Sequence, residues 1–283
     1  SGVKQMFEDQ ELAKELADKG YQFSSANSIN IGRLVPQVAY YVYAYTKLLA
    51  NGEIKDGEKI NVVVPTGNFG NIQAAYYAKN LGVPIAKLIC ASNDNKVLYD
   101  FFQTGTYDKN REFVLTTSPS MDILISSNLE RLIYLICGED SEKTKELMEE
   151  LKTTGKYTIT PEMKEKLADF AAGYSTEEET AESIHDTYQK TGYVMDTHTA
   201  VAAHVCGQYR AKSGDQTKCV IASTASPYKF VKSVMSAIDA ENANADEFDL
   251  LPKLQEVSGV PMPQAIKDIL DAKVLHDLEC DAG

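Results

Sequence analysis

Apolar and polar positions alternate along the chain in a way that predicts short buried strands separated by helices. Three short apolar runs bounded by turn-forming residues predict strands over residues 61–64, 84–90 and 217–222. Apolar residues at helical spacing predict helices over residues 33–50, 72–79, 96–102, 176–191, 198–212 and 228–238. Strands that alternate with helices favour an α/β fold with a mostly parallel sheet flanked by helices.

The remaining segments carry weaker patterns. Residues 3–19 predict an amphipathic helix, and residues 21–25 a short strand. Between residues 128 and 170 the pattern is helical and charged, so we expect residues 138–175 to form a helical insertion on the sheet domain. Residues 241–283 are expected to form acidic helices that pack on the rest of the domain. Pro252, Pro261 and Pro263 are expected to interrupt these helices.

One stretch, NVVVPTGNFGNIQAAYYAK at residues 61–79, predicts a strand, a glycine-containing turn and a helix. Gly67 and Gly70 are expected to bring the backbone close to a ligand and to adopt dihedrals that a side chain would forbid, so that successive N–H groups converge on an anion. The turn lacks the Lys-Ser/Thr of a triphosphate loop and does not fit G-x-G-x-x-G. A single phosphate monoester is therefore favoured, although a tight turn that uses glycine for geometry alone stays open.

Composition and charge narrow the function. The chain has 283 residues, 43% of them hydrophobic, and can bury a full core as one large domain or two unequal ones. A formal charge of −13 argues against binding to nucleic acid or to an anionic membrane. No apolar run reaches membrane-spanning length. Five cysteines without C-x-x-C spacing suggest neither disulfides nor a metal site, and fit a reducing cytoplasm; they are Cys90, Cys137, Cys206, Cys219 and Cys280.

Polar turns follow each of the three predicted strands, at residues 66–71, 91–95 and 223–227. Because ligands bind beyond the carboxyl ends of parallel strands, we expect these turns to face one crevice. A phosphate-binding turn and a hydroxyl-bearing corner suit a flat, phosphorylated cofactor. Pyridoxal phosphate matches both features.

Four long strings carry a resemblance to a known family: SSANSINIGRLVPQVAYY, VPTGNFGNIQAAYYAK, TSPSMDILISSNLERL and STASPYKF. They resemble threonine synthases of the bacterial and fungal type, which have the tryptophan synthase β-like fold, also called pyridoxal phosphate fold type II. The resemblance covers nearly the whole chain. It implies an enzyme that uses pyridoxal phosphate to convert O-phosphohomoserine and water to threonine and phosphate.

The resemblance also implies two sets of binding residues. The turn holding the cofactor phosphate is Gly67, Asn68, Phe69, Gly70 and Asn71, and Thr224 meets the pyridine nitrogen. The substrate phosphate is expected at Asn27, Ser28 and Arg33. A cation there holds the phosphate while it becomes the leaving group. An arginine at a helix start can instead pair with an acid or face solvent, and that reading stays open.

Other polar residues are interpreted as structural. We take His198, within Asp196-Thr197-His198-Thr199, as part of a helix start. Residues 126–131 look like a helix cap followed by a surface ion pair. The tyrosines after Pro36 are expected to serve packing.

The family's Schiff-base lysine lies in an amino-terminal motif that no segment of this chain resembles. We therefore expect no catalytic lysine here, with residues 1–25 forming the tail of the small domain and residues 26–283 the large, cofactor-binding domain. The chain alone is expected to be inactive, to pair with the family's amino-terminal portion, and to expose apolar surface or self-associate. Another enzyme of this fold, such as threonine dehydratase or cysteine synthase, stays open, as does a non-enzymatic domain that binds a phosphate ligand.

Overall fold

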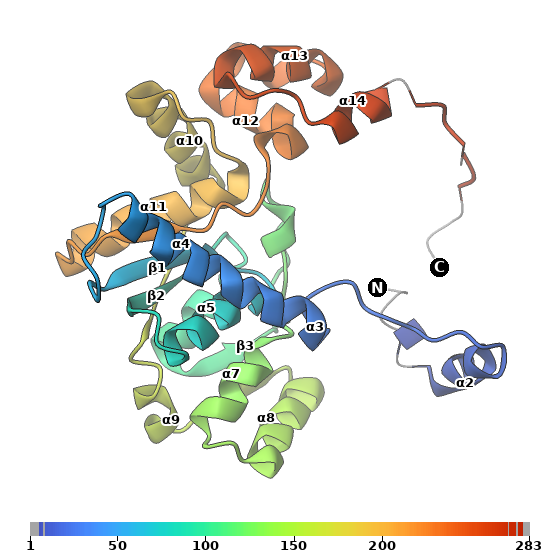
Figure 1. Cartoon of the computed structure of the whole chain (residues 1–283). Coiled ribbons are helices and arrows are strands. Elements are labelled where there is room, and N and C mark those ends of the chain that lie inside the picture. The colour runs from blue at the N-terminus through green and yellow to red at the C-terminus, as the bar shows by residue number, and fades with distance from the viewer. Residues whose placement is uncertain (1–5, 8, 271, 276, 280–283) are drawn as a thin grey trace.

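A four-stranded parallel sheet forms the centre of the computed structural model (Figure 1). The structure describes residues 6–7, 9–270, 272–275 and 277–279. The strands are β1 (Ile60–Pro65), β2 (Ile85–Ser92), β5 (Phe170–Tyr174) and β6 (Cys219–Ile221), in the order β5-β2-β1-β6. All neighbouring strands pair in parallel, so the predicted sheet is confirmed.

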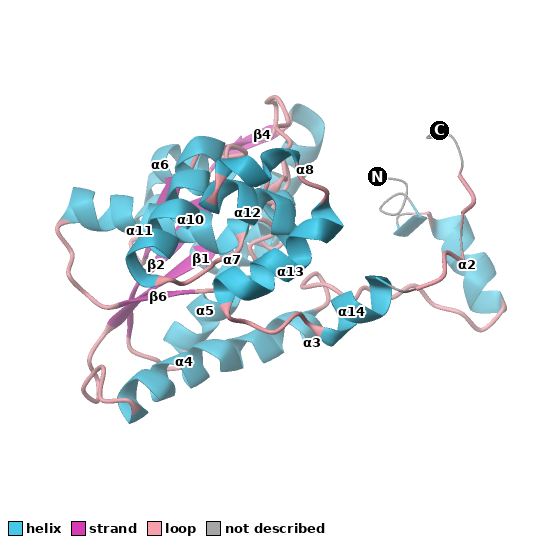
Figure 2. Cartoon of the chain, turned by 90° about the horizontal axis from the view of Figure 1, so that it is seen from above, coloured by secondary structure: helices cyan, strands magenta, loops and turns pink. Residues whose placement is uncertain are grey.

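Helices cover both faces of the sheet (Figure 2). Helix α11 (Thr197–Ser213) lies on one face, and α5 (Gly70–Asn80) and α6 (Val97–Thr104) on the other. Side chains of β1 alternate accordingly: Val63 packs in the same cluster as Val201 of α11, whereas Val62 belongs to the core on the α5 side. Strand periodicity therefore divides the apolar residues between two cores.

The other helices surround this centre. Before β1 the chain forms α3 (Ile31–Leu34), the 3₁₀ turn η1 (Val35–Gln37) and α4 (Val38–Ala50). The middle of the chain adds η2 (Pro119–Met121), α7 (Leu129–Ile136), α8 (Ser141–Thr154), α9 (Pro161–Glu165) and α10 (Glu177–Thr191). After β6 follow η3 (Pro227–Phe230), α12 (Val231–Ile238), η4 (Ala240–Asn244), α13 (Glu247–Ser258) and α14 (Gln264–Leu270). Helices α10, α12 and α13 share a separate apolar core.

Two strands lie where only helices were expected. The short strand β4 (Lys156–Thr158) pairs antiparallel with β3 (Thr106–Asp108), and β5 joins the main sheet. Strand β5 was missed because its sequence, FAAGY, lacks β-branched residues. A Cβ on Gly173 would lie 2.7 Å from Val205 Cγ1, so a small residue is needed for close packing under α11.

Both ends of the chain also differ from expectation. Helix α2 (Gln10–Asp18) confirms part of the predicted first helix, but Val3 lies outside the described residues. Residues 21–25 do not form a strand, because α2 and its connection stand away from the sheet (Figures 1 and 2) and offer no pairing partner. Contrary to expectation, Pro252 does not end a helix but lies inside α13 on its exposed side. The domain boundary at residue 25 stays a prediction.

No helix in the described part of the chain is long and apolar enough to cross a membrane. Four cysteines are described, and all are free thiols: Cys90, Cys137, Cys206 and Cys219. Burial raises the pKa of the Cys90 thiol to about 12, so this residue behaves as a small apolar side chain. Cys280 lies outside the described residues.

Replacing Ile72 of α5 with alanine should destabilise the fold. Its side chain is fully buried in the core between α5 and the sheet, so Ile72→Ala should lower the free energy of unfolding by about 2–5 kcal/mol. Leu81, just after the same helix, is 77% exposed. Leu81→Ala should therefore change the free energy of unfolding by less than about 0.5 kcal/mol. Urea unfolding of both variants measures the difference. Equal losses would contradict the packing described.

Candidate ligand-binding site

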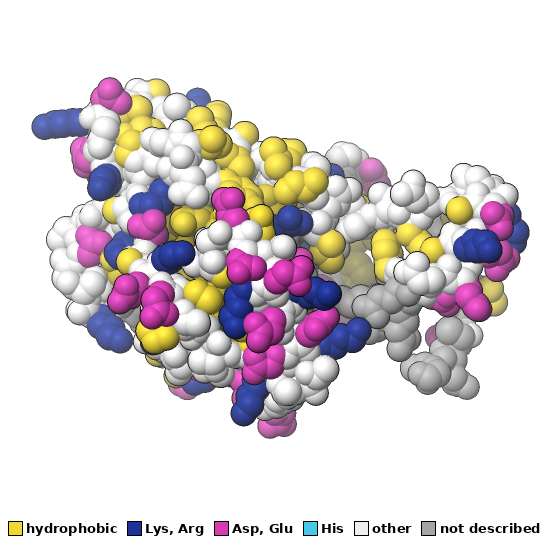
Figure 3. All heavy atoms as spheres, turned by 90° about the horizontal axis from the view of Figure 1, so that it is seen from below, with side chains coloured by type: hydrophobic (Ala, Val, Ile, Leu, Met, Phe, Trp, Pro, Cys, Tyr) yellow, Lys and Arg dark blue, Asp and Glu magenta, His cyan; other side chains and the backbone are white. Residues whose placement is uncertain are grey.

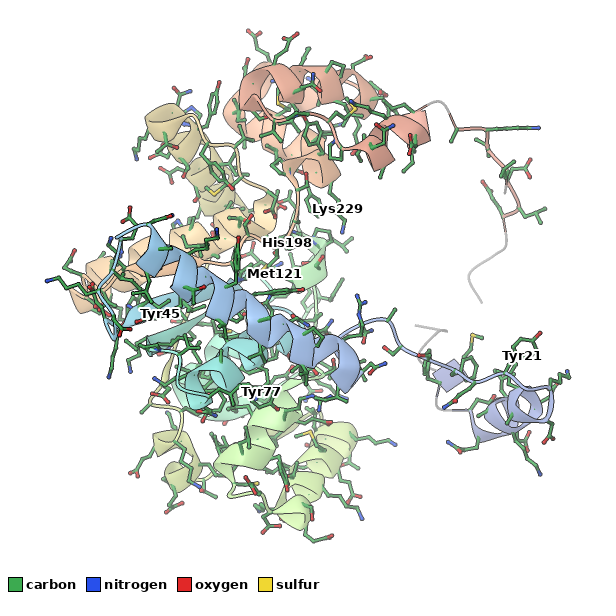
Figure 4. The ribbon with its side chains drawn as sticks, in the orientation of Figure 1. Tyr21, Tyr45, Tyr77, Met121, His198 and Lys229 are labelled. Carbon is green, nitrogen blue, oxygen red and sulfur yellow. The ribbon has the colours of Figure 1, made fainter. Side chains whose placement is uncertain are left out.

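A cavity of about 250 Å³ opens at the carboxyl ends of β1 and β6. Its lining includes residues 65–71 of the glycine-containing turn together with Thr224 and Lys229. Figure 4 shows Met121, His198 and Lys229, which also line it, close together beside the sheet. Two of the three polar turns expected to face one crevice therefore line the same cavity.

The third polar turn, after β2, does not line this cavity. Its buried Asn93 and Asn95 each donate a side-chain hydrogen bond to Asp122 Oδ1, at 2.8 Å and 2.9 Å. Asp122 also accepts the Thr116 N–H at 3.0 Å. This turn thus holds the loop of residues 114–122, whose Ser120 and Met121 reach the cavity.

The turn after β1 presents a row of unused backbone donors. Among the hydrogen bonds between described residues, none uses the N–H groups of residues 67–71. The Thr66 N–H is different, because it donates to Ala91 O at 2.8 Å. Five successive free donors at the start of an 11-residue helix form an arrangement that binds anions well. Residues 67–71 therefore have backbone donors available to a ligand, whereas the Thr66 N–H is already used within the sheet.

The glycines of this turn are needed for close packing and not for unusual dihedrals. Neither Gly67 nor Gly70 has a positive φ; the residue with φ +64° is Phe69. A Cβ on Gly67 would lie 2.5 Å from Ser120 O, and one on Gly70 would collide with Ser28 Oγ. The expectation that the glycines adopt forbidden dihedrals was wrong, because neighbouring segments press against the turn at both positions.

Phe69 keeps its left-handed backbone because its side chain is anchored. The ring is 1% exposed and packs against Phe102 and Phe170, with centroid distances of 6.2 Å and 6.1 Å. A strained φ in a non-glycine residue persists where surrounding packing determines it. The aromatic cluster thus fixes the backbone shape of residues 67–71, whose N–H groups are called the donor row below.

Residues 126–131 hold the turn in place, so their interpretation as a helix cap and surface pair was wrong. Ser126 Oγ donates to Gly67 O at 2.7 Å. Asn128 Nδ2 donates to Asn68 O at 2.9 Å and to Ser28 Oγ at 3.0 Å, and makes no side-chain cap for α7. Polar residues just before an apolar helix look like a cap in sequence, so no sequence signal identifies this role.

One tyrosine of α4 also contacts the site. The Tyr41 hydroxyl donates to Asn71 Oδ1. Burial raises the pKa of Tyr41 well above its ordinary value, and its neighbour Tyr40 adds to this, so the hydroxyl stays a donor. The tyrosine stripe was expected to serve packing, and Tyr41 in addition orients a residue of the donor row.

A second depression of about 360 Å³ adjoins the first and shares Ser28 and Gln37 with it. Asn27 and Arg33 also line it. Asn27 Oδ1 accepts from the Ile29 N–H at 3.0 Å and from Ser25 Oγ at 2.8 Å, and no hydrogen bond between described residues uses its side-chain amide donors. No carboxylate of the described residues lies within ion-pair distance of Arg33. The guanidinium therefore remains available to an anionic ligand.

The first turn of α11 contributes His198 to the lining of the main cavity. His198 is 3% exposed, and its Nε2 accepts from the Ser120 N–H at 3.2 Å. Its Nδ1 lies 3.2 Å from Oδ1 of Asp196, the N-cap of α11. Burial opposes ionisation of Asp196, but hydrogen bonds from His198 and Thr199 outweigh it and hold the pKa of this carboxyl below its usual value.

Comparisons with known proteins agree with this geometry. Residues 199–273 match the family model described as threonine synthase, C-terminal. The chain is 42% identical over 264 residues to threonine synthase-like 1 of Pongo abelii, covering 92% of this chain and 35% of that protein. It is 37% identical over 266 residues to threonine synthase of Saccharomyces cerevisiae, covering 89% of this chain and 50% of that protein.

Solved structures show the same likeness. A threonine synthase of Brucella melitensis, determined with pyridoxal phosphate bound, is 41% identical with a TM-score of 0.73, over 83% of this chain and 48% of that one. The yeast threonine synthase structure is 35% identical with a TM-score of 0.75, over 92% and 52%. The chain thus has the fold of the pyridoxal phosphate fold type II class.

Within that class, the chain is similar to threonine synthases along most of its length, and residues 199–273 match the carboxy-terminal model of that family. It spans between 35% and 58% of the length of the curated relatives named threonine synthase or threonine synthase-like 1 that were compared. The family model covers its carboxy-terminal part, from within α11 to beyond α14.

Gly70→Ala should weaken anion binding, because the added Cβ collides with Ser28 and displaces the donor row. Affinity for inorganic phosphate, measured by calorimetry, should fall by at least about fivefold, the value of one lost hydrogen bond. Gly207 is the matched control, since its Cβ would meet nothing within 4 Å in the middle of α11. Gly207→Ala should keep wild-type affinity and stabilise the helix by up to about 1 kcal/mol. Unchanged affinity in the Gly70 variant would contradict the site.

Proposed function

We propose that this chain is the large-domain part of a threonine synthase that binds pyridoxal phosphate and acts on O-phosphohomoserine. The observation that carries the proposal is the row of five free N–H groups at residues 67–71, which shares one cavity with Thr224. Known relatives of similar sequence include threonine synthases, one of them solved with this cofactor. The reaction would add water and release phosphate to form threonine.

The residues present fit the cofactor. The donor row would hold its phosphate, and the hydroxyl of Thr224, which lines the same cavity, would meet its pyridine nitrogen. Bound pyridoxal phosphate supplies an electron-withdrawing ring for chemistry at the carbon atoms of an attached amino acid. A neutral hydroxyl cannot protonate the nitrogen as a carboxylic acid would, so Thr224 keeps the ring a moderate electron acceptor.

The second depression fits the phosphate of the substrate. Ser28 and Gln37 line both hollows, so a ligand in the main cavity can extend a phosphate toward Arg33 without displacing the cofactor phosphate. Asn27 and Ser28 would orient that phosphate, and Arg33 would stabilise its charge as the bond to carbon breaks. Threonine dehydratases and cysteine synthases use no substrate phosphate, so an unpaired arginine beside the main cavity favours a phosphorylated substrate.

We propose that the cofactor's Schiff-base partner lies outside this chain, in the amino-terminal portion of the family. Lys229 lines the cavity and follows Thr224 closely in the chain. A Schiff-base lysine would have to reach the carbon attached para to the ring nitrogen, so a lysine next to Thr224 would be poorly placed for that role. Residues 26–283 would then be the large domain and residues 1–25 the end of the small one. Scattered cysteines without disulfide spacing support a reducing, cytoplasmic location.

Exposed apolar side chains support association with that portion or with a second copy. Several large ones lie between residues 29 and 43, namely Ile29, Ile31, Val35, Tyr40, Val42 and Tyr43. Figure 3 shows a band of hydrophobic side chains across one face of the molecule, with charged side chains on both sides of it. Apolar surface of this kind is ordinarily covered by another chain or domain.

The purified chain should bind pyridoxal phosphate without covalent attachment and release no phosphate from O-phosphohomoserine, because it would lack the Schiff-base lysine. Phosphate release and mass spectrometry after borohydride reduction measure both properties. Adding a family amino-terminal portion should restore turnover. Turnover or a reduced cofactor adduct in the isolated chain would show that one of its own lysines serves. A non-enzymatic phosphate-binding domain would bind the cofactor yet gain no activity from the added portion.

Arg33→Ala should raise KM for O-phosphohomoserine in the reconstituted enzyme by about 10–100-fold, since charge-assisted hydrogen bonds to the substrate phosphate are lost. Arg33→Lys keeps the charge but not the paired donors, so its KM should lie between those of the wild type and Arg33→Ala. Lys47→Ala removes an exposed cation from the same helical region, outside both hollows, and should leave KM unchanged. An unchanged KM in Arg33→Ala would remove the main reason for this substrate.

A further inference from the structure

The first turn of α11 touches both walls of the cofactor cavity. Thr197 Oγ1 donates to Thr117 O at 2.8 Å, and His198 Nε2 accepts the Ser120 N–H. On the other side, Thr199 Oγ1 lies 3.3 Å from Ser223 Oγ, directly before Thr224. One helical turn is therefore bonded to the loop that contacts the donor row and to the hydroxyl corner.

Asp196 orients His198 within this turn. Its Oδ1 accepts the backbone N–H groups of His198 and Thr199 at 2.9 Å and 3.3 Å and lies 3.2 Å from His198 Nδ1. A carboxylate beside Nδ1 favours the tautomer with the proton on Nδ1. That tautomer leaves a lone pair on Nε2, which the Ser120 N–H needs as its acceptor. The opposite tautomer would place two donors face to face.

Ser120 in turn sets the position of the donor row. Its carbonyl oxygen is so close to Gly67 that a Cβ there would lie 2.5 Å away. A shift of Ser120 would therefore move the wall against which the turn packs. The His198 ring has little freedom to follow, because it also packs on Phe230 at a centroid distance of 4.9 Å.

We propose that His198, oriented by Asp196, is a positioning residue that sets the spacing between the anion site at residues 67–71 and Thr224. It acts through Ser120 and needs no contact with substrate. The inference rests on the proposed function, under which this spacing must match the distance between the phosphate and the ring nitrogen of pyridoxal phosphate. It also replaces the interpretation of His198 as only part of a helix start.

Two substitutions separate the role of each ring nitrogen. In His198→Gln, the longer side chain can place an oxygen near Nε2 and keep an acceptor for the Ser120 N–H. In His198→Asn, the amide reaches the place of Nδ1, keeps the bond to Asp196 and leaves Ser120 without an acceptor. Hydrogen exchange in residues 118–121 should speed up by about tenfold in the Asn variant and stay within about threefold of wild type in the Gln variant.

Cofactor binding gives the second readout. The affinity of the chain for pyridoxal phosphate, followed by the absorbance and induced circular dichroism of the cofactor, should fall by about tenfold in His198→Asn and recover in His198→Gln. His204 provides matched controls on the same helix, because it contacts Gln208 at 2.8 Å and does not line the cavity. His204→Asn and His204→Gln should both behave as wild type.

The outcomes distinguish this inference from the proposed function. Equal exchange in the Asn and Gln variants, or equal loss of cofactor affinity in both, overturns the positioning role. A wild-type chain that binds no pyridoxal phosphate overturns the proposed function, while the exchange measurement still decides whether His198 holds Ser120. Should His198→Asn fail to fold, wild-type exchange and affinity in His198→Gln support the inference and loss of either overturns it.

Discussion

Close packing against the turn after β1 is the constraint on which the rest of the site depends. The loop carrying Ser120 presses on Gly67 from one side, and Ser28 presses on Gly70 from the other. These contacts leave no room for a side chain at either glycine. They also hold residues 67–71 so that their N–H groups have no partner in the described part of the chain. The donor row is thus kept open by its neighbours and not by an internal property of the turn.

A formal charge of −13 would not prevent this chain from binding a small anion at the proposed site, because the attraction there would be local. Backbone N–H groups and the start of α5 contribute oriented partial charges that act over a few ångströms. Arg33 adds a full charge in the adjoining depression. Net charge governs long-range attraction and solubility, whereas these groups govern binding of a small ligand.

Polar side chains, more than the apolar core, connect the separate segments around the cavity. Asn128 joins Asn68 to Ser28, segments 40 residues apart or more along the chain, through two hydrogen bonds from one amide group. The Asp122 carboxylate accepts hydrogen bonds from Asn93, Asn95 and Thr116. Buried networks of this kind specify one arrangement, since any unmade hydrogen bond is costly. Such rigidity would keep the distance between residues 67–71 and Thr224 constant, as the proposed function requires.

The sequence by itself determined the parallel sheet, most helices and the glycine-containing turn after β1, because periodicity and turn residues are local signals. It missed β5, whose small residues FAAGY matter only beneath α11, and it took Asn128 for a helix cap. Only the tertiary structure decided that Phe69 and not a glycine has the positive φ, that the Thr66 N–H is used by Ala91 O, and that His198 reaches Ser120. These features depend on contacts between residues far apart in the chain, which local patterns do not encode.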